Sequence, residues 1–286
     1  MAELSFESIT RSVIAGSPVD GVLRFRATRP VRARDFTILL RGAENTSARV
    51  SSGKHSYTVR DAYLFLAHER SLMQVVASPI ATELPPGDHR IPFRFIVPPG
   101  SPPSMSIGSA REGAAMSYVV EARINVPWWP DAVARSTVVV LPPHRSLGSG
   151  PRPTRGSRSW AGKSEAELLF RADPGAVEMG KSFTGEYRIE NPDRKRIRKL
   201  TISLVRIVDW SAAGRRRAGK GPTFTLKTKI GIAAESSSGR FALPLPQHES
   251  ATIPWTGHLI RVRWVVRVSL DVAWGFDAVF EIPLSR

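Results

Sequence analysis

The sequence predicts an all-β protein built from two tandem β-sandwich domains, and three observations support this fold class. Apolar and polar residues alternate with a period of two along 117–126 and again along 262–274, a spacing that suits a half-buried strand. No stretch of a dozen residues sustains the i, i+3, i+4, i+7 apolar spacing of a helix. About fourteen short candidate strands fill the 286 residues, which favours two sandwiches of about seven strands over one.

The candidate strands are separated by turn residues such as Pro18, Gly53 and Gly214. In the first half they cover 3–9, 19–28, 35–46, 56–66, 88–97, 117–126 and 133–141. In the second half they cover 165–172, 183–190, 197–210, 223–234, 239–245, 262–274 and 276–284. A short helix is compatible with residues 67–77.

A linker composition marks the domain boundary. Residues 142–163 contain four Gly, four Pro, four Ser and no acidic residue, so they offer little to bury. We therefore expect an N-terminal sandwich over 1–141, a linker over 142–163 and a C-terminal sandwich over 164–286, each immunoglobulin-like in its number of strands.

The two halves resemble each other in three features that occur in the same order. Gly16-x4-Gly21 has its counterpart in Gly180-x4-Gly185, and the run 90–98 has its counterpart in 240–246. A long alternating strand follows about twenty residues later in each half. The sequence thus indicates a duplicated sandwich.

Several motifs of the first half occur together in a known order. A Pro-Gly turn at 86–87 precedes the Pro-Phe-x-Phe strand at 92–95, a Pro-Ser loop at 103–104 follows, and a Tyr-led strand begins at Tyr118. Pro92 cannot donate a backbone hydrogen bond, so its strand is expected at a sheet edge or bulge. This combination resembles the N-terminal domain of the arrestin family.

The resemblance covers most of 1–141 and, more weakly, 164–286, which looks like the arrestin C-terminal domain. Bacterial members similar to the sporulation-control protein Spo0M are closer in size than visual arrestins. The resemblance implies two cupped sandwiches and a non-enzymatic adaptor or scaffold role. The sequence has no Pro-Pro-x-Tyr, and the charged latch and phosphate sensor of visual arrestins find no matching positions, so neither ubiquitin-ligase recruitment nor receptor desensitisation is carried over.

The chain is strongly basic, with 41 Lys and Arg against 25 Asp and Glu and a formal net charge of +16. Such a field attracts phosphorylated peptides, anionic lipid headgroups or nucleic acid without choosing among them. The alternative is that the arginines reflect a GC-rich genome and merely solvate strand faces.

Two basic clusters and one strand face supply the candidate contacts for anions or partners. The run 214–221 nearly fits the phosphate-binding G-x4-G-K-[ST] loop, but Gly221 replaces the hydroxyl residue and Pro222 follows, so we interpret it as a basic hairpin tip. The outward residues Arg24 and Arg26 would add to the same field. The candidate residues are Arg194, Lys195, Arg196, Arg198, Lys199, Arg215, Arg216, Arg217, Lys220, Arg261, Arg263 and Arg267. The alternative is that they are solvated turns and edges protected by charge, and nucleic acid is disfavoured because aromatic platforms are missing nearby.

Catalytic, cofactor and metal chemistry finds no support in the sequence. There is no Cys and no G-x-S-x-G elbow, and His68-Glu69 and His248-Glu249 lack the second His of H-E-x-x-H. We expect no catalytic, cofactor-binding or metal residues, and no enzyme. Trp128-Trp129 is expected to close the end of the sandwich, with an exposed partner or membrane anchor as the alternative.

The N-terminus lacks the features of a signal peptide, and no stretch is long and apolar enough to span a membrane. We therefore expect a cytoplasmic protein, with membrane association as an added possibility. The leading hypothesis is an adaptor for protein partners, including acidic or phosphorylated segments. The alternative is a peripheral membrane module that recognises anionic lipid headgroups.

Overall fold

The structure is a computed structural model. It describes residues 2–52, 55–76, 83–142, 146–150, 154–160, 163–190, 197–219, 225–231, 237–245, 253–272 and 278–284. These residues are mostly strand, with one short helix among them, so the predicted all-β fold class is confirmed. The chain divides into two compact units. Unit 1 comprises Met1–Pro143, Ser211–Arg215 and Gly257–Leu259, and unit 2 comprises His144–Trp210, Arg216–Thr256 and Ile260–Arg286.

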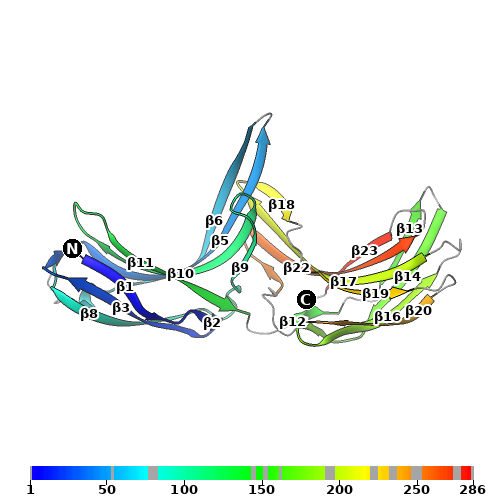
Figure 1. Cartoon of the computed structure of the whole chain (residues 1–286), viewed down its shortest axis with the longest axis horizontal. Coiled ribbons are helices and arrows are strands. Elements are labelled where there is room, and N and C mark those ends of the chain that lie inside the picture. Colours follow the sequence, from blue (N-terminus) through cyan, green and yellow to red (C-terminus); the bar gives the residue numbers. More distant parts are fainter. Residues whose placement is uncertain are drawn as a thin grey trace. The chain divides into compact units, whose positions relative to one another are not determined.

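Unit 1 is a sandwich of two main sheets, which lie one over the other in Figure 1. The first sheet contains, in order, β1 (Ala2–Ile9), β3 (Pro18–Ala27) and β8 (Gly87–Ile96). The second contains, in order, β2 (Ser12–Ile14), β11 (Ala132–Leu141), β10 (Gly113–Asn125), β5 (Asp35–Ser52) and β6 (His55–Ser71), with β9 (Met105–Gly108) paired to β10. The remaining elements are β4 (Val31–Arg32), its partner β7 (Glu83–Leu84), and α1 (Met73–Val76).

The core of unit 1 follows the alternation that the sequence predicts. Its inward residues on β10 have no exposed surface: Tyr118, Val120, Ala122 and Ile124. Phe25 of the first sheet meets Phe36 of the second at 5.8 Å between ring centroids, so one core joins both sheets. Strand β8, which carries Pro92, lies at the edge of its sheet, and the predicted edge position is confirmed.

Tyr118 is the one buried ring here that also needs a hydrogen-bond partner. Its hydroxyl donates to the carbonyl oxygen of Pro102 at 2.6 Å, and Phe65 packs against its ring edge-on at 5.6 Å. Burial raises the pKa of Tyr118 because the charged phenolate would lose its hydration. The residue therefore ties the 98–104 loop to the core.

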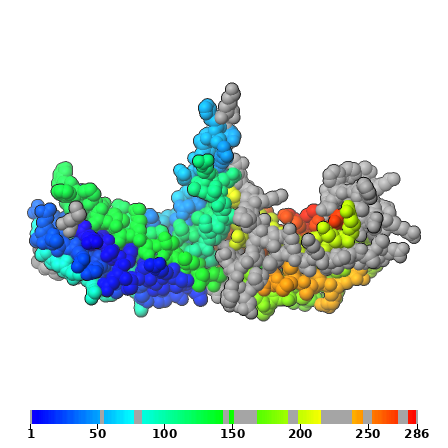
Figure 2. Space-filling view, in the orientation of Figure 1, coloured from blue at the N-terminus to red at the C-terminus, as the bar shows by residue number. Residues whose placement is uncertain are grey.

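The β5–β6 hairpin extends further than the sequence suggests. The two strands pair from Thr37, opposite Ser71, to Ser52, opposite His55, with one shift of register between Gly42 and Ala43. The hairpin protrudes from the rest of unit 1 in Figures 1 and 2. The strands continue past 46 because Thr46, Ala48 and Val50 form a buried row on β5 while the backbone groups pair with β6.

A buried carboxylate lies on β5. Glu44 is 1% exposed, and its two oxygens accept hydrogen bonds from the backbone N–H groups of His258 at 3.2 Å and Leu259 at 2.6 Å. Tyr63 stacks on the His258 ring at 4.3 Å between centroids. These bonds offset the cost of removing a carboxylate from water.

Unit 2 is also built from sheets of antiparallel strands. One sheet contains, in order, β13 (Thr154–Trp160), β14 (Lys163–Ala172), β16 (Ser182–Glu190) and β20 (Ser237–Pro244). Another contains β18 (Arg215–Gly219), β17 (Ile197–Ala212), β22 (Ile260–Val272) and β21 (Trp255–Thr256), with β19 (Thr225–Gly231) paired to β17 and β23 (Ala278–Pro283) paired to β22. Strands β12 (Ser146–Ser149) and β15 (Ala176–Glu178) form a separate pair.

The core of unit 2 again lies between the two larger sheets. On β22 the inward residues are buried as the alternation predicts: Val262, Trp264, Val266, Val268 and Leu270. Phe241 on β20 lies 5.2 Å from the Phe170 ring and 5.4 Å from the Phe183 ring. The three rings and the β22 row therefore fill the space between the sheets.

The repeat predicted from the paired glycines is confirmed in the backbone. Gly16 and Gly180 both adopt a positive φ, 94° and 85°, which only glycine adopts without strain. The N–H of Gly16 donates to the carbonyl of Val97 at 2.8 Å, and that of Gly180 donates to the carbonyl of Leu245 at 3.2 Å. The same turn therefore opens the same strand in each unit.

The second glycine of each motif lies under a phenylalanine of the neighbouring strand. Gly21 is paired with Phe93, and Gly185 is paired with Phe241. A Cβ added to Gly21 would lie 2.4 Å from the Phe93 ring, and one added to Gly185 would lie 2.7 Å from the Phe241 ring. In both units the ring occupies the space that a side chain would need.

Two features differ in detail from the sequence expectation. The range 142–163 contains strands β12 and β13, although it has almost no apolar side chains, because strand pairing needs only backbone groups. The helix expected within 67–77 is limited to α1, since β6 continues to Ser71. The division into domains at 142–163 stays a prediction.

Candidate functional site

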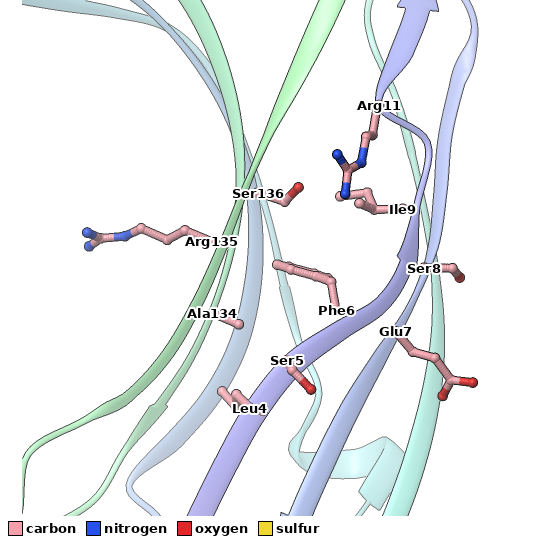
Figure 3. Close-up of a pocket in the computed structure, with 10 residues that line it drawn as sticks. All are labelled: Leu4, Ser5, Phe6, Glu7, Ser8, Ile9, Arg11, Ala134, Arg135 and Ser136. Carbon is pink, nitrogen blue, oxygen red and sulfur yellow. The ribbon is translucent and has the colours of Figure 1, made fainter.

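A groove of about 590 Å³ lies between β1 and β11 in unit 1 (Figure 3). β1 and the turn after it supply most of its wall, and β11 supplies the other side. It is lined by Leu4, Ser5, Phe6, Glu7, Ser8, Ile9, Arg11, Ala134, Arg135 and Ser136.

The groove exists because two sheets end beside each other without joining. β1 is the last strand of the first sheet, and among the described strands it pairs with β3 alone. β11 pairs with β10 on one side, and β2 reaches its other side only at Val139–Leu141. In the described part of the chain, the edge of β1 and the edge of β11 before Val139 therefore carry unpaired backbone donors and acceptors.

Three apolar side chains of β1 lie among the polar residues that line the groove. In Figure 3 the ring of Phe6 points across the groove toward β11, while Glu7 and Ser8 point away from it. Leu4, Phe6 and Ile9 are half-buried and pack on the core, and Phe6 meets Phe93 edge-on at 5.7 Å. An extended segment placed here would cover apolar surface with every second side chain.

The rim of the groove carries two arginines. Arg135 points away from the groove in Figure 3 and donates to Glu121 at 2.7 Å. Glu7 accepts from Arg90 at 2.8 Å. Arg11 forms no ion pair with any described residue, and its carbonyl accepts from the Val139 N–H at 2.8 Å, which fixes it at one end of the groove. Arg11 therefore leaves a positive charge at that end.

Glu121 gathers three arginines on the outer face of β10. Its carboxylate lies 2.7 Å from Arg135, 3.3 Å from Arg123 and 3.7 Å from Arg41. Burial alone would raise the pKa of Glu121, but the hydrogen bond from Arg135 and the three positive charges outweigh it, so the pKa is lowered. The cluster holds β11 beside β10 and so supports one wall of the groove.

The outer face of the first sheet is a row of ion pairs. Arg24 binds Asp88 at 2.6 Å, and Arg26 approaches the same carboxylate at 3.3 Å. Arg94 binds Asp20 at 2.6 Å. The hydrogen bond from Arg24 lowers the pKa of Asp88 to about 2. Arg24 and Arg26 therefore lie on the outer face as expected, but both are paired with the Asp88 carboxylate.

The described members of the predicted basic set are distributed over β17 and β22. Arg198 and Lys199 share the Asp271 carboxylate at 3.5 and 3.4 Å. Two of the three β22 arginines are also paired, since Arg263 binds Asp209 at 3.0 Å and Arg267 binds Glu281 at 2.6 Å. The third, Arg261, is exposed and stands opposite Asp209 in the strand register. Their charge is therefore largely compensated locally.

The other members of that set lie on β18 or outside the described residues. Arg215, Arg216 and Arg217 form part of strand β18, so the hairpin tip is Ala213-Gly214 and not the basic run expected there. Arg194, Lys195, Arg196 and Lys220 lie outside the described residues. Anion or partner binding by the set stays a prediction.

Within the described ranges, no three His, Asp or Glu side chains come together as a metal site would require. No helix in the part of the chain that the structure describes is long and apolar enough to cross a bilayer.

The groove was not predicted from the sequence. The alternation along 3–9 indicates which side chains point inward, but it cannot tell that β1 ends a sheet. The edge positions of β1 and β11 depend on pairing with strands that lie far away in the chain. The one local indication of the groove in the sequence is Arg11, a charged residue between two expected strands.

The comparison with protein families gives one match. The model of the arrestin (or S-antigen) N-terminal domain matches residues 4–146, which is half of the 286-residue chain. The matched segment contains both strands that form the groove. No curated protein matches the sequence.

Proposed function

Since the chain belongs to the arrestin family, we propose that it is a non-enzymatic adaptor that binds an extended segment of a protein partner in the groove between β1 and β11. The observation that carries the proposal is the pair of strand edges that flank the groove, with Leu4, Phe6 and Ile9 on one side of it. An incoming strand would gain backbone hydrogen bonds from an edge and selectivity from alternate side chains.

The chemistry of the rim favours an acidic or phosphorylated segment. Arg11 places a guanidinium at one end of the groove, and a guanidinium can bind carboxylate or phosphate oxygens in a forked geometry. The net charge of +16 would accelerate the approach of such a segment at low salt. The basic residues predicted from the sequence would act as additional contacts for anions, independently of the groove.

The test uses a library of extended peptides, with neutral, acidic and phosphorylated members, titrated against the full-length protein. Ser136→Arg fills the groove with a long side chain, whereas Thr137→Arg changes the outward neighbour on the same strand and serves as the matched control. We expect selected peptides to lose at least tenfold in affinity for Ser136→Arg and to retain affinity for Thr137→Arg.

Arg11→Glu tests the preference for anions separately. It should reverse the order of acidic and neutral peptides while leaving the fold intact, because Arg11 is exposed. Equal binding of all peptides to wild type and Ser136→Arg would refute the groove as the site. Turnover of a small molecule by the purified protein would refute the adaptor role.

We further propose a cytoplasmic location and the domain division at 142–163. The finer likeness to Spo0M-like members also stays a prediction.

A further inference from the structure

The turn between β10 and β11 exposes two adjacent tryptophans. Trp128 is 96% exposed and Trp129 is 68% exposed. The sequence expectation that these rings close the end of the sandwich is therefore wrong, and the alternative of an exposed anchor remains. A fully exposed ring of this size is rare, because tryptophan is usually buried in a core or an interface.

The backbone of this turn is unusual as well. Pro127 and Trp128 occupy its central positions, and the Trp129 N–H donates to the Val126 carbonyl at 3.3 Å. Trp128 has φ of +66°, one of two non-glycine residues with positive φ among those described. The third position of such a turn favours glycine, so tryptophan is held there against the local backbone preference. The flanking Pro127 and Pro130 limit the number of conformations available to the tip.

Other exposed apolar residues lie at the same end of unit 1. Val133, at the start of β11, is 38% exposed, and Val75, in α1, is 63% exposed. The α1 segment is joined to this end because the Leu72 N–H donates to the Phe36 carbonyl, and Phe36 is paired with Ile124 near the end of β10.

Charges of both signs lie beside the turn. The Arg34 N–H donates to the Asn125 carbonyl at 2.8 Å, so Arg34 lies beside the base of the turn. Arg34 is exposed and forms no ion pair with any described residue, whereas the nearby Asp131 faces Arg123 at 3.8 Å. Asp35, which is paired with Asn125 in the strand register, is also exposed and forms no ion pair with a described residue, so it offsets Arg34. Attraction to an anionic surface therefore comes from the net charge of +16 of the whole chain.

We propose that the Trp128-Trp129 turn is an anchor that inserts into the interfacial region of an anionic lipid bilayer. Tryptophan concentrates at the headgroup level of membranes because its ring is amphipathic. The fully exposed Trp128 ring is not enclosed by neighbours, whereas the tryptophan of a protein hot spot lies in a well-packed pocket with a rim of contact residues. The net charge of +16 would add electrostatic attraction to anionic headgroups, which salt would screen.

The test measures co-flotation of the full-length protein with phosphatidylcholine vesicles, with and without phosphatidylserine. We expect wild type to float with the anionic vesicles, and Trp128→Ala/Trp129→Ala to reduce the partition coefficient on the order of tenfold for each ring removed. Tyr57→Ala, which removes an aromatic side chain 51% exposed on β6, is the matched control and should change nothing. Brominated lipids should quench part of the tryptophan fluorescence of wild type and not that of the double variant.

Trp128→Gly separates binding from folding. Glycine adopts the observed φ without strain, so this variant should unfold at a temperature equal to or above that of wild type and still lose vesicle binding. Absence of wild-type flotation with every vesicle would overturn the proposal, and so would unchanged flotation of the double variant. Ser136→Arg should float normally, so failure of the anchor and failure of the peptide groove are distinguishable.

Discussion

Replacing Gly21 by alanine should destabilise unit 1, although the opposite is expected from backbone preference alone. Glycine within a strand is normally about 0.5–1 kcal/mol less favourable than alanine. Here the added Cβ would lie 2.4 Å from Phe93 Cζ and 2.7 Å from the Ser8 carbonyl oxygen, well inside the 3.5–4.0 Å of a favourable carbon contact. The ring would have to retreat by about 1 Å.

The surroundings leave little room for that movement. Phe93 is 8% exposed, and its ring is held by Phe6 at 5.7 Å and by Phe95 at 6.0 Å. Overpacking of this kind costs about 1–3 kcal/mol, and the second clash is with backbone, so we expect a loss of about 3 kcal/mol in the free energy of unfolding. Guanidinium unfolding followed by both fluorescence and circular dichroism would measure it and would reveal whether the two units unfold separately.

A double-mutant cycle with Phe93→Leu identifies the cause. If the ring is the obstacle, Gly21→Ala should cost less in the Phe93→Leu background, with a coupling of at least about 1 kcal/mol. Gly100→Ala is the control, since nothing lies within 4 Å of its added Cβ and only its φ of +82° opposes the change. A Gly21→Ala variant as stable as wild type, or an additive cycle, would refute the reasoning.

Three further predictions concern hydrogen bonds and ionisation. Tyr118→Phe removes the hydroxyl that donates to Pro102 and should lower the free energy of unfolding by about 1–3 kcal/mol. Because the pKa of Tyr118 is raised in the folded protein, wild type should lose stability as the pH rises above about 10, and the variant should lose less. Denaturant titrations at alkaline pH would measure both effects. The pKa of Glu121 is lowered in the folded protein, so its contribution to stability is present above the pKa of an unfolded glutamate, about 4.3, and is lost at lower pH. Glu121→Gln should therefore be less stable than wild type at neutral pH, and the difference should shrink on acidification. A difference that does not change with pH would contradict this. In NMR titrations Asp88 should show a pKa of about 2, and Arg24→Gln should raise it toward 3.8.

The fold class and the identity of the core residues could be predicted because strand periodicity is a local property. The inward rows of β10 and β22 follow directly from alternation, and the paired glycines of the two halves indicate equivalent turns. The extension of β5 to Ser52 was not predicted, because the two buried apolar residues there, Ala48 and Val50, lie in a Ser- and Arg-rich run that has the composition of a loop.

The candidate site depended on information that no local pattern contains. Phe6 is an ordinary inward residue of an alternating strand, and it lines a groove only because β1 has no neighbour on one side. Conversely, Arg263 and Arg267 looked available as anion contacts, but Asp209 and Glu281 reach them from neighbouring strands. The exposure of Trp128 was also hidden, since the sequence is equally compatible with rings folded over the sandwich end.

The ion pairs on the outer face of the first sheet influence how this basic protein associates electrostatically with other molecules in the cell. The arginines of β3 and β8 lie among carboxylates from β1, β3 and β8, so that wall is close to electroneutral although the whole chain carries +16. Polyanions such as ribosomal surfaces should therefore bind only weakly to the outer face of the first sheet. The excess positive potential then concentrates on the remaining faces, which gives the molecule a preferred orientation in any encounter with a negatively charged body.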